Sequence, residues 1–385
     1  MKKSFPLLIA LAACGGSSSS NPDAPAGTAD AAADANVAPA DAAVWTTPKC
    51  TTVMGTGGVT FTTDEGATLA PTDQQLTPPT YTRGLVALGD PNRLLAGTGN
   101  AILLSTDAGC TWRSIGTTDD TLVLNAAGAK RAYGWMDNGT VLVRVDDETI
   151  TKLTAPGTST IVGLGVDPAN PDHVRIGDAA TQLWDSTDAG ASWTVQGNLA
   201  SSDPNAFAYR AAFDPASLDH VIVGTIGTGA FVTTNGGDGK LGWAPAMGTA
   251  AGSSGRSNVF TAVISPVDPK IVWAQGIDIS DGDKREVWRS TDGGATFTVV
   301  LTEGVDQISL QNGPPMFAHP TDANVLYVAF GVSFQNYGTD VFRYDAQSKA
   351  LTKTHNQYHR LFAVAFSPVS PTLMYFGVSL EPTGG

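Results

Sequence analysis

The residues best suited to bind a ligand are arginines that stand at the start of apolar segments. Four of them share this position: Arg83, Arg210, Arg256 and Arg360. Tyr358 and His359 flank Arg360 and add aromatic surface beside a cation. A guanidinium group presents a planar fork of donors that holds a carboxylate through two parallel hydrogen bonds. Such a cluster near the channel could hold a carboxylate. The alternative, which is the better expectation, is that the arginines pair with surface acids of an acidic chain.

Two further groups of side chains carry the chemistry of binding sites. Asp278, Asp281 and Asp283 lie in one polar segment and offer the hard oxygen ligands that Ca²⁺ prefers. Their spacing does not match an EF-hand loop, so a solvated acidic loop with no metal is the better expectation. Phe334 and Tyr337, with amide residues between them, suit contact with a sugar or a peptide, or packing over a neighbour. No residue pattern calls for a cofactor.

The start of the chain predicts export. Residues 1–13 contain two lysines followed by a short apolar run, which is typical of a signal peptide and too short to span a bilayer. The string Leu11-Ala12-Ala13-Cys14 resembles the lipobox of bacterial lipoproteins. The resemblance implies that Cys14 is lipidated and anchors the protein to a bacterial membrane, and Gly15 after it favours the outer membrane. The alternative is an ordinary signal peptide.

Residues 14–43 are rich in Gly, Ser, Ala, Pro, Asn and Asp, with almost nothing to bury, and predict a disordered tether. The net charge of -14 and the absence of a basic stripe disfavour a nucleic-acid partner. Two cysteines remain beyond Cys14, namely Cys50 and Cys110. Export permits a disulfide between them, and two free thiols are an equal alternative.

One motif recurs along the rest of the chain, Ser/Thr-x-Asp-x-Gly-x-x-aromatic. Three close copies and two weaker ones are centred on Asp107, Asp188, Asp292, Asp64 and Asn235. The pattern fits a tight turn, in which the carboxylate accepts backbone N–H groups and Gly adopts a backbone conformation that other residues avoid. We therefore expect structural carboxylates. The copies resemble the Asp boxes of BNR-type repeats.

Each motif follows two apolar segments joined by a turn that contains proline, which predicts antiparallel strands. Four strands and one Asp box make a propeller blade. From Asp107 to Asp188 there are 81 residues, against 43 from Asp64 to Asp107, so a blade with an eroded box belongs at Val141–Leu153, with Asp147 at its turn. Another eroded copy is Val341–Asp345. The fold class is therefore all-β, a single seven-bladed propeller over residues 44–385.

The two ends of the propeller predict how it closes. The folded part starts with one strand, Gly58–Phe61, and its box, and it finishes with two strands between Leu361 and Leu380. These half-blades complement each other. We expect them to pair into one four-stranded blade, which removes the free sheet edges and locks the ring.

The repeats resemble those of sialidases, two-propeller xyloglucanases, photosystem assembly factors and sortilin-type receptors. The resemblance implies that the Asp boxes lie on one rim, and that any binding pocket is to be sought on the opposite face, around the central channel. The Arg-Ile-Pro motif of sialidases is absent; the nearest string is Arg175-Ile176-Gly177. One propeller does not build the cleft of a xyloglucanase, and no catalytic carboxylate pair stands out.

We therefore expect a monomeric cell-envelope protein that acts as a non-catalytic binding or scaffolding module. Its partner would be an envelope protein or a glycan, and it would touch the membrane through its lipid anchor alone. The alternative is a glycoside hydrolase or a carbohydrate-binding propeller.

Overall fold

The structure is a computed structural model, and it describes residues 44–199, 207–236, 242–249, 257–279, 282–332, 337–356 and 360–381. Residues Val44–Gly385 form one compact unit, whose regular elements are all β-strands. Within the described residues, no helix has the length and hydropathy needed to span a bilayer. The predicted signal peptide, the tether and Cys14 lie outside these residues.

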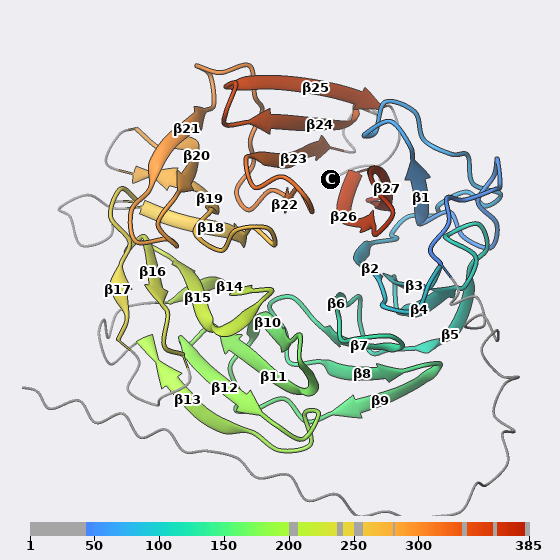
Figure 1. Cartoon of the computed structure of the whole chain (residues 1–385), viewed down its shortest axis with the longest axis horizontal. Coiled ribbons are helices and arrows are strands. Elements are labelled where there is room, and N and C mark those ends of the chain that lie inside the picture. Colours follow the sequence, from blue (N-terminus) through green and yellow to red (C-terminus); the bar gives the residue numbers. More distant parts are fainter. Residues whose placement is uncertain are drawn as a thin grey trace, which may run out of the picture. The chain divides into compact units, whose positions relative to one another are not determined.

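Seven antiparallel sheets are arranged in a ring, as the sequence predicted (Figure 1). Blade 1 has four strands: β2 (Thr82–Ala87), β3 (Leu94–Thr98), β4 (Ala101–Ser105) and β5 (Arg113–Thr117). Blade 2 has β6 (Val123–Ala126), β7 (Arg131–Trp135), β8 (Leu142–Asp146) and β9 (Thr149–Leu153). Blade 3 has β10 (Ile161–Asp167), β11 (Asn170–Asp178), β12 (Gln182–Ser186) and β13 (Thr194–Asn198).

The next three blades repeat this order, with the first strand innermost. Blade 4 has β14 (Ala208–Asp214), β15 (Ser217–Thr225), β16 (Ala230–Thr233) and β17 (Ala244–Pro245). Blade 5 has β18 (Ser257–Ile264), β19 (Val272–Asp278), β20 (Lys284–Ser290) and β21 (Thr298–Thr302). Blade 6 has β22 (Met316–Ala318), β23 (Val325–Val332), β24 (Gly338–Asp345) and β25 (Ala350–Asn356). The two blades with eroded boxes, 2 and 6, are therefore present.

Blade 7 closes the ring from both parts of the chain, which confirms the predicted closure. It contains β26 (Arg360–Ser367), β27 (Ser370–Ser379) and β1 (Val59–Thr62), and β1 pairs antiparallel with β27, with Phe61 opposite Tyr375. The expectation of a fourth strand was wrong. After β1 the chain comes back alongside this strand, where Ala70 N donates a backbone hydrogen bond to Phe61 O. It does not continue as a fourth strand, because Thr72 then bridges to Val53.

Apolar side chains from neighbouring blades interdigitate and hold the ring together. Between blades 1 and 2, for example, Leu95 and Ile102 pack in one buried cluster with Leu122, Leu124 and Val143. Similar clusters join the other neighbours, so each blade buries its faces against the next one. The inner strands are thereby fixed as a rigid wall around the channel.

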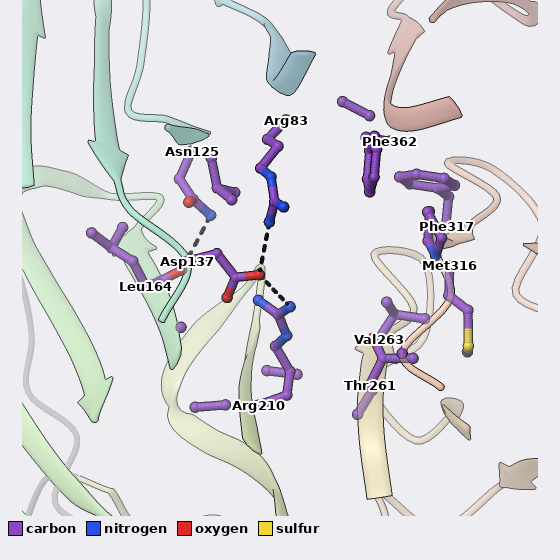
Figure 2. Close-up of a pocket in the computed structure, with 18 of the residues that line it drawn as sticks. Arg83, Asn125, Asp137, Leu164, Arg210, Thr261, Val263, Met316, Phe317 and Phe362 are labelled. Atoms are coloured by element: carbon purple, nitrogen blue, oxygen red, sulfur yellow. Dashed lines mark hydrogen bonds and ion pairs between the residues drawn. The ribbon is translucent and has the colours of Figure 1, made fainter. Parts of the chain in front are cut away.

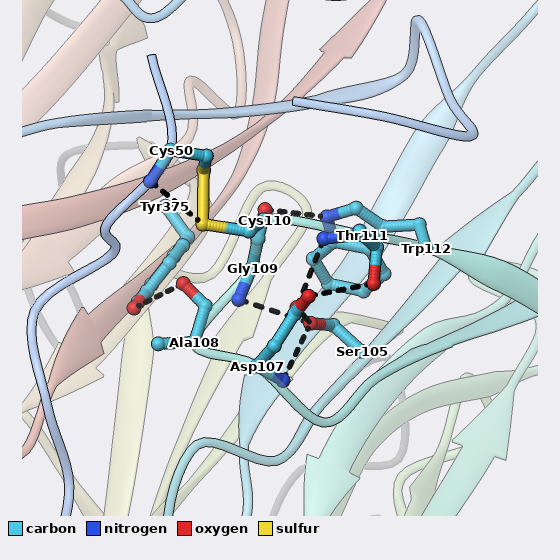
Figure 3. Close-up of a disulfide and its surroundings, with 9 residues drawn as sticks. All are labelled: Cys50, Ser105, Asp107, Ala108, Gly109, Cys110, Thr111, Trp112 and Tyr375. Carbon is cyan, nitrogen blue, oxygen red and sulfur yellow. Dashed lines mark hydrogen bonds between the residues drawn. A yellow bond between two sulfur atoms is a disulfide. The ribbon is translucent and has the colours of Figure 1, made fainter. Parts of the chain in front are cut away.

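The Asp boxes form the turns between the third and fourth strands. In blade 1, Asp107 accepts hydrogen bonds from the Thr111 N–H at 2.9 Å and from its hydroxyl at 2.7 Å, while the Ser105 hydroxyl accepts the Gly109 N–H at 2.9 Å (Figure 3). Gly109 has a φ of 86°, a left-handed conformation that favours glycine. The carboxylates of these boxes are thus engaged by their own turns.

Hydrogen bonding in these turns predicts a specific response to acid. In blade 3 the hydroxyl and N–H of Ser192, with the Ser186 hydroxyl, lower the pKa of Asp188 to about 2. Because this pKa lies below that of the unfolded chain, about 3.9, the stabilisation is present above pH 4 and is lost as the pH falls toward 2. We expect Asp188→Asn to lose less thermal stability than the wild type between pH 5 and pH 2.5. Asparagine fits, since Asn235 occupies the same position in blade 4. Thermal melting at each pH measures this difference. Melting temperatures that fall by the same amount in the two proteins would contradict the expectation.

A strap formed by residues 45–56 crosses the box of blade 1. Met54 N donates to Cys110 O, and Trp112 N donates to Met54 O, so the strap runs parallel to the box. Gly55 has a φ of 84°, and a Cβ there would lie 2.0 Å from Trp112 O, so only glycine fits. Met247 and Gly248 make the same contacts with the box of blade 5.

A disulfide between Cys50 and Cys110 ties the strap to this box (Figure 3). Of the two alternatives that the sequence left open, the structure has the bonded pair. Because disulfides form and persist in oxidising compartments, the protein is extracytoplasmic.

Candidate binding face at the mouth of the channel

A cavity of about 480 Å³ lies in the central channel. All seven innermost strands, or the connections into them, contribute to its wall. Arg83, Asp137 and Arg210 stand at the end where the connections between blades and the loops between second and third strands lie (Figure 2). We call this surface the mouth face. It is the face opposite the Asp boxes, where the family resemblance predicts ligand binding.

Two arginines converge on one aspartate across the mouth. Arg210, near the start of β14, donates from Nη2 to Asp137 Oδ2 at 3.2 Å. Arg83, in β2, places Nη1 3.6 Å from the same oxygen, which is an ion pair longer than a hydrogen bond (Figure 2). The three groups together carry one net positive charge, although the chain as a whole carries -14.

Asp137 is held in place by the loop between β7 and β8. Its neighbour Asn138 donates from its N–H to Ile161 O at 3.1 Å, and Ile161 N donates to Gly139 O at 2.7 Å, so the loop is fastened to blade 3. The Asp137 side chain is 13% exposed. Its second oxygen, Oδ1, is buried and has no hydrogen-bond partner among the described residues. A buried acceptor of this kind is costly unless water or a ligand satisfies it.

Aromatic rings support the arginines. The guanidinium carbon of Arg360 lies 4.4 Å from the centre of the Phe362 ring, and that of Arg83 lies 5.3 Å from it. Arg210 lies 5.8 Å from the ring centre of Trp135. Such cation–π contacts hold each guanidinium in one orientation. Arg83 and Arg360 are therefore brought together, on the same ring, as the sequence suggested.

Each of these arginines also has an acid of the chain as a partner, as the alternative interpretation expected. Arg360 Nη1 donates to Glu381 Oε1 at 2.6 Å, and its Nη2 donates to Gln311 Oε1 at 3.1 Å. The acids belong to the mouth face itself and not to a distant surface. The cluster is thus an ordered set of charges, and the guanidinium groups have more N–H donors than these contacts use.

The rim of the mouth face exposes apolar side chains. Phe207 is 52% exposed and Ile226 is 43% exposed, and Ile226 N donates to Phe207 O at 3.1 Å, so the two residues are neighbours. Tyr337, on the loop between β23 and β24, is 38% exposed. Phe207 and Tyr337 are the exposed large aromatic residues of the described chain, and both belong to this face.

Tyr337 is fixed by a buried acid. Its hydroxyl donates to Asp340 Oδ2 at 2.6 Å, and His355 Nδ1 lies 2.7 Å from Asp340 Oδ1. The hydrogen bond to the carboxylate raises the pKa of Tyr337, because ionisation of the phenol would remove its donor. The ring is therefore a neutral, oriented contact residue.

The remaining predicted site residues do not join this cluster in the described chain. Asp278 stands opposite Lys284 in the hairpin of β19 and β20, and Asp283 lies in its turn. Among the described residues, no three His, Cys, Asp or Glu side chains are placed to hold a metal ion. Five of the residues predicted for this face lie outside the described part: Arg256, Asp281, Phe334, Tyr358 and His359.

Sequence reasoning missed three central residues, Trp135, Asp137 and Phe362. Trp135 is the last residue of the second strand of blade 2, and Asp137 lies two residues beyond it. The box of this blade is eroded, so the repeat pattern did not point to either residue. An acid just beyond a second strand was the available signal. Phe362 lies two residues after Arg360 on the same inner strand, and that alternation was visible in the sequence.

No family model matches the chain. A known protein nevertheless shows its family. Over 341 residues the chain is 47% identical to the dispase autolysis-inducing protein of Streptomyces mobaraensis. The match covers 87% of this chain and 90% of that protein. The chain belongs to the family of the dispase autolysis-inducing protein. The mouth face described above is therefore a feature of a member of that family.

Solved structures resemble this member of the dispase autolysis-inducing family in fold alone. A GH74 xyloglucanase from Xanthomonas campestris is 16% identical with a TM-score of 0.56, over 83% of this chain and 56% of that enzyme. The chain thus spans about half the length of the GH74 enzymes that it matches. YCF48 bound to a D1 peptide is 13% identical with a TM-score of 0.52, over 79% of this chain and 95% of that protein.

Proposed function

We propose that this protein is an extracytoplasmic binding protein that docks a partner protein on its mouth face. By its family, the partner is a protease of the dispase kind, and docking promotes the cleavage of the protease by itself. The relative is named for inducing the autolysis of dispase. The propeller would serve as a rigid non-catalytic platform.

The exposed aromatic residues of the rim are the observation that carries this proposal. Phe207 and Tyr337 stand out from a face that also presents Arg360. Aromatic residues and arginine are enriched in protein interfaces and supply most hot spots of binding energy. A ring of stacked blades holds them at fixed separations, which reduces the entropy lost on docking. YCF48, a propeller of similar fold, is described as bound to a peptide.

The proposal predicts an effect on a protease in solution. Purified propeller is added to dispase, and the loss of the intact protease is followed by gel electrophoresis and by its activity. We expect autolysis to accelerate. The effect should saturate as the propeller concentration rises, because every protease molecule is then occupied by a docked propeller. An unchanged autolysis rate over a range of propeller concentrations would contradict the proposal. Binding to a glycan panel without any effect on the protease would favour the carbohydrate alternative.

Lipid anchoring is the second part of the proposal and rests on the lipobox resemblance at Cys14. In a bacterial expression host, the full chain is expected in the membrane fraction, and Cys14→Ser is expected to move it to the soluble fraction. Mass spectrometry of the mature N-terminus checks the modification directly. A wild-type chain that is already soluble, with an unmodified N-terminus, would overturn the anchor.

A further inference from the structure

The channel beneath the docking rim has the properties of a small-molecule site. Its volume of about 480 Å³ falls within the range typical of ligand pockets. One side is polar and contains Arg83, Asp137 and Arg210 (Figure 2). The other side is apolar and includes Val263, Met316 and Phe317. Such a division suits a ligand that has one charged end and one apolar end.

The charges of the polar side call for one negative charge. Two guanidinium groups face a single carboxylate, so one positive charge is not balanced within the set. Arg210 donates to Asp137 from Nη2, and Arg83 Nη1 lies at the longer distance of 3.6 Å from the same carboxylate. Both forks therefore keep N–H donors that a second carboxylate can accept. A monocarboxylate would bring the set to neutrality.

The buried oxygen of Asp137 adds a second requirement. Oδ1 has no hydrogen-bond partner among the described residues and is shielded from solvent. A carboxylate oxygen of an aspartate is an acceptor only. Because Asp137 lines the cavity, a ligand satisfies this oxygen once the side chain turns toward it, by donating an N–H or O–H from an atom close to its own carboxylate.

We propose that this cavity binds an apolar α-carboxylic acid that carries a hydrogen-bond donor beside its carboxylate, as an N-acylated apolar amino acid does. The carboxylate accepts from Arg83 and Arg210, the neighbouring N–H donates to Asp137 Oδ1, and the side chain packs against Val263, Met316 and Phe317. A free acylated amino acid and the last residue of a polypeptide share this chemistry. This proposal does not depend on the docking of a protein, and it is tested on the purified chain without a partner.

Calorimetric titration of the purified full chain tests the inference with three matched probes. N-acetyl-phenylalanine carries carboxylate, donor and ring; its amide lacks the carboxylate; 3-phenylpropanoate lacks the donor. We expect saturable binding of the first at one site per chain, and binding at least about tenfold weaker for the other two. A pentapeptide that ends in a free phenylalanine carboxylate distinguishes the sources: tighter binding than the acetylated amino acid identifies a chain end, and weaker binding identifies the free acid.

Variants link the binding to the named residues. Arg210→Met removes the donors but keeps the length of the side chain, and it should weaken N-acetyl-phenylalanine at least about tenfold. Arg113→Met is the control, since Arg113 pairs with Glu148 on an exposed outer strand. Asp137→Asn should abolish the preference for N-acetyl-phenylalanine over 3-phenylpropanoate, and melting curves establish that each variant is folded. The absence of saturable binding at millimolar concentrations, equal affinity for acid and amide, or equal loss in Arg113→Met would overturn the inference.

Discussion

Removing the disulfide by replacing Cys50 and Cys110 with alanine is expected to lower the free energy of unfolding by about 3 to 4 kcal/mol. The bridge closes a loop of 60 residues that contains β1, the closing strand of blade 7. Without it, the unfolded chain gains the entropy of an open loop, and the strap leaves the box of blade 1 more readily. Denaturant unfolding followed by tryptophan fluorescence measures the loss, since Trp45 and Trp112 are buried in this region.

Chemical reduction separates the bond from the substitution. A reducing agent should destabilise the wild-type protein by a similar amount and should leave the double alanine variant unchanged. A loss below about 1 kcal/mol would be far from the expected effect of such a loop. It would mean that the strap and β1 hold the ring closed without the covalent link.

Replacing Phe207 and Ile226 with serine is expected to weaken binding of the partner protease at least about tenfold. The two side chains are neighbours on the mouth rim, and apolar contacts at an interface centre contribute most of its energy. Because both side chains are about half exposed in the free protein, the free energy of unfolding should change much less than the binding energy. Surface plasmon resonance with a catalytically inactive protease measures the affinity without loss of the protease to autolysis.

Val195 and Val299 provide the matched control. They are exposed to a similar degree, 52% and 49%, but belong to the outer strands β13 and β21. Serine at these positions removes two apolar side chains of similar fractional exposure from the outside of the ring. If the control pair weakened binding as much as the rim pair, the partner would not dock specifically on the mouth face.

Much of the fold was predictable because the propeller repeats itself. The Asp boxes at Asp107, Asp188 and Asp292 set the blade period, and the half-blades around Phe61 and Tyr375 indicated how the ring closes. The missing fourth strand of blade 7 was not predictable from the repeat. It depends on the strap at Val53, which bridges to Thr72 and draws the chain away from β1.

The site was predictable only in part, because its members come from blades far apart in the sequence. Arg83 lies in blade 1, Asp137 in blade 2 and Arg210 in blade 4, and no local spacing relates them. Strand order placed the arginines at one end of the channel, as expected. The curvature of the closed ring, and not any motif, brings Asp137 between two of these arginines. It also leaves one oxygen of Asp137 without a hydrogen bond from the described residues.

Hydrogen–deuterium exchange of the propeller, alone and with the inactive protease, tests the central claim most directly. Amide protection on docking is predicted at residues 207–210, 226–229, 337–340 and 360–362, which carry the rim and its arginines. The turns at Asp107, Asp188 and Asp292, on the opposite rim, should exchange equally in both states. Protection confined to those Asp-box turns, with the mouth face unchanged, would contradict docking on the mouth face.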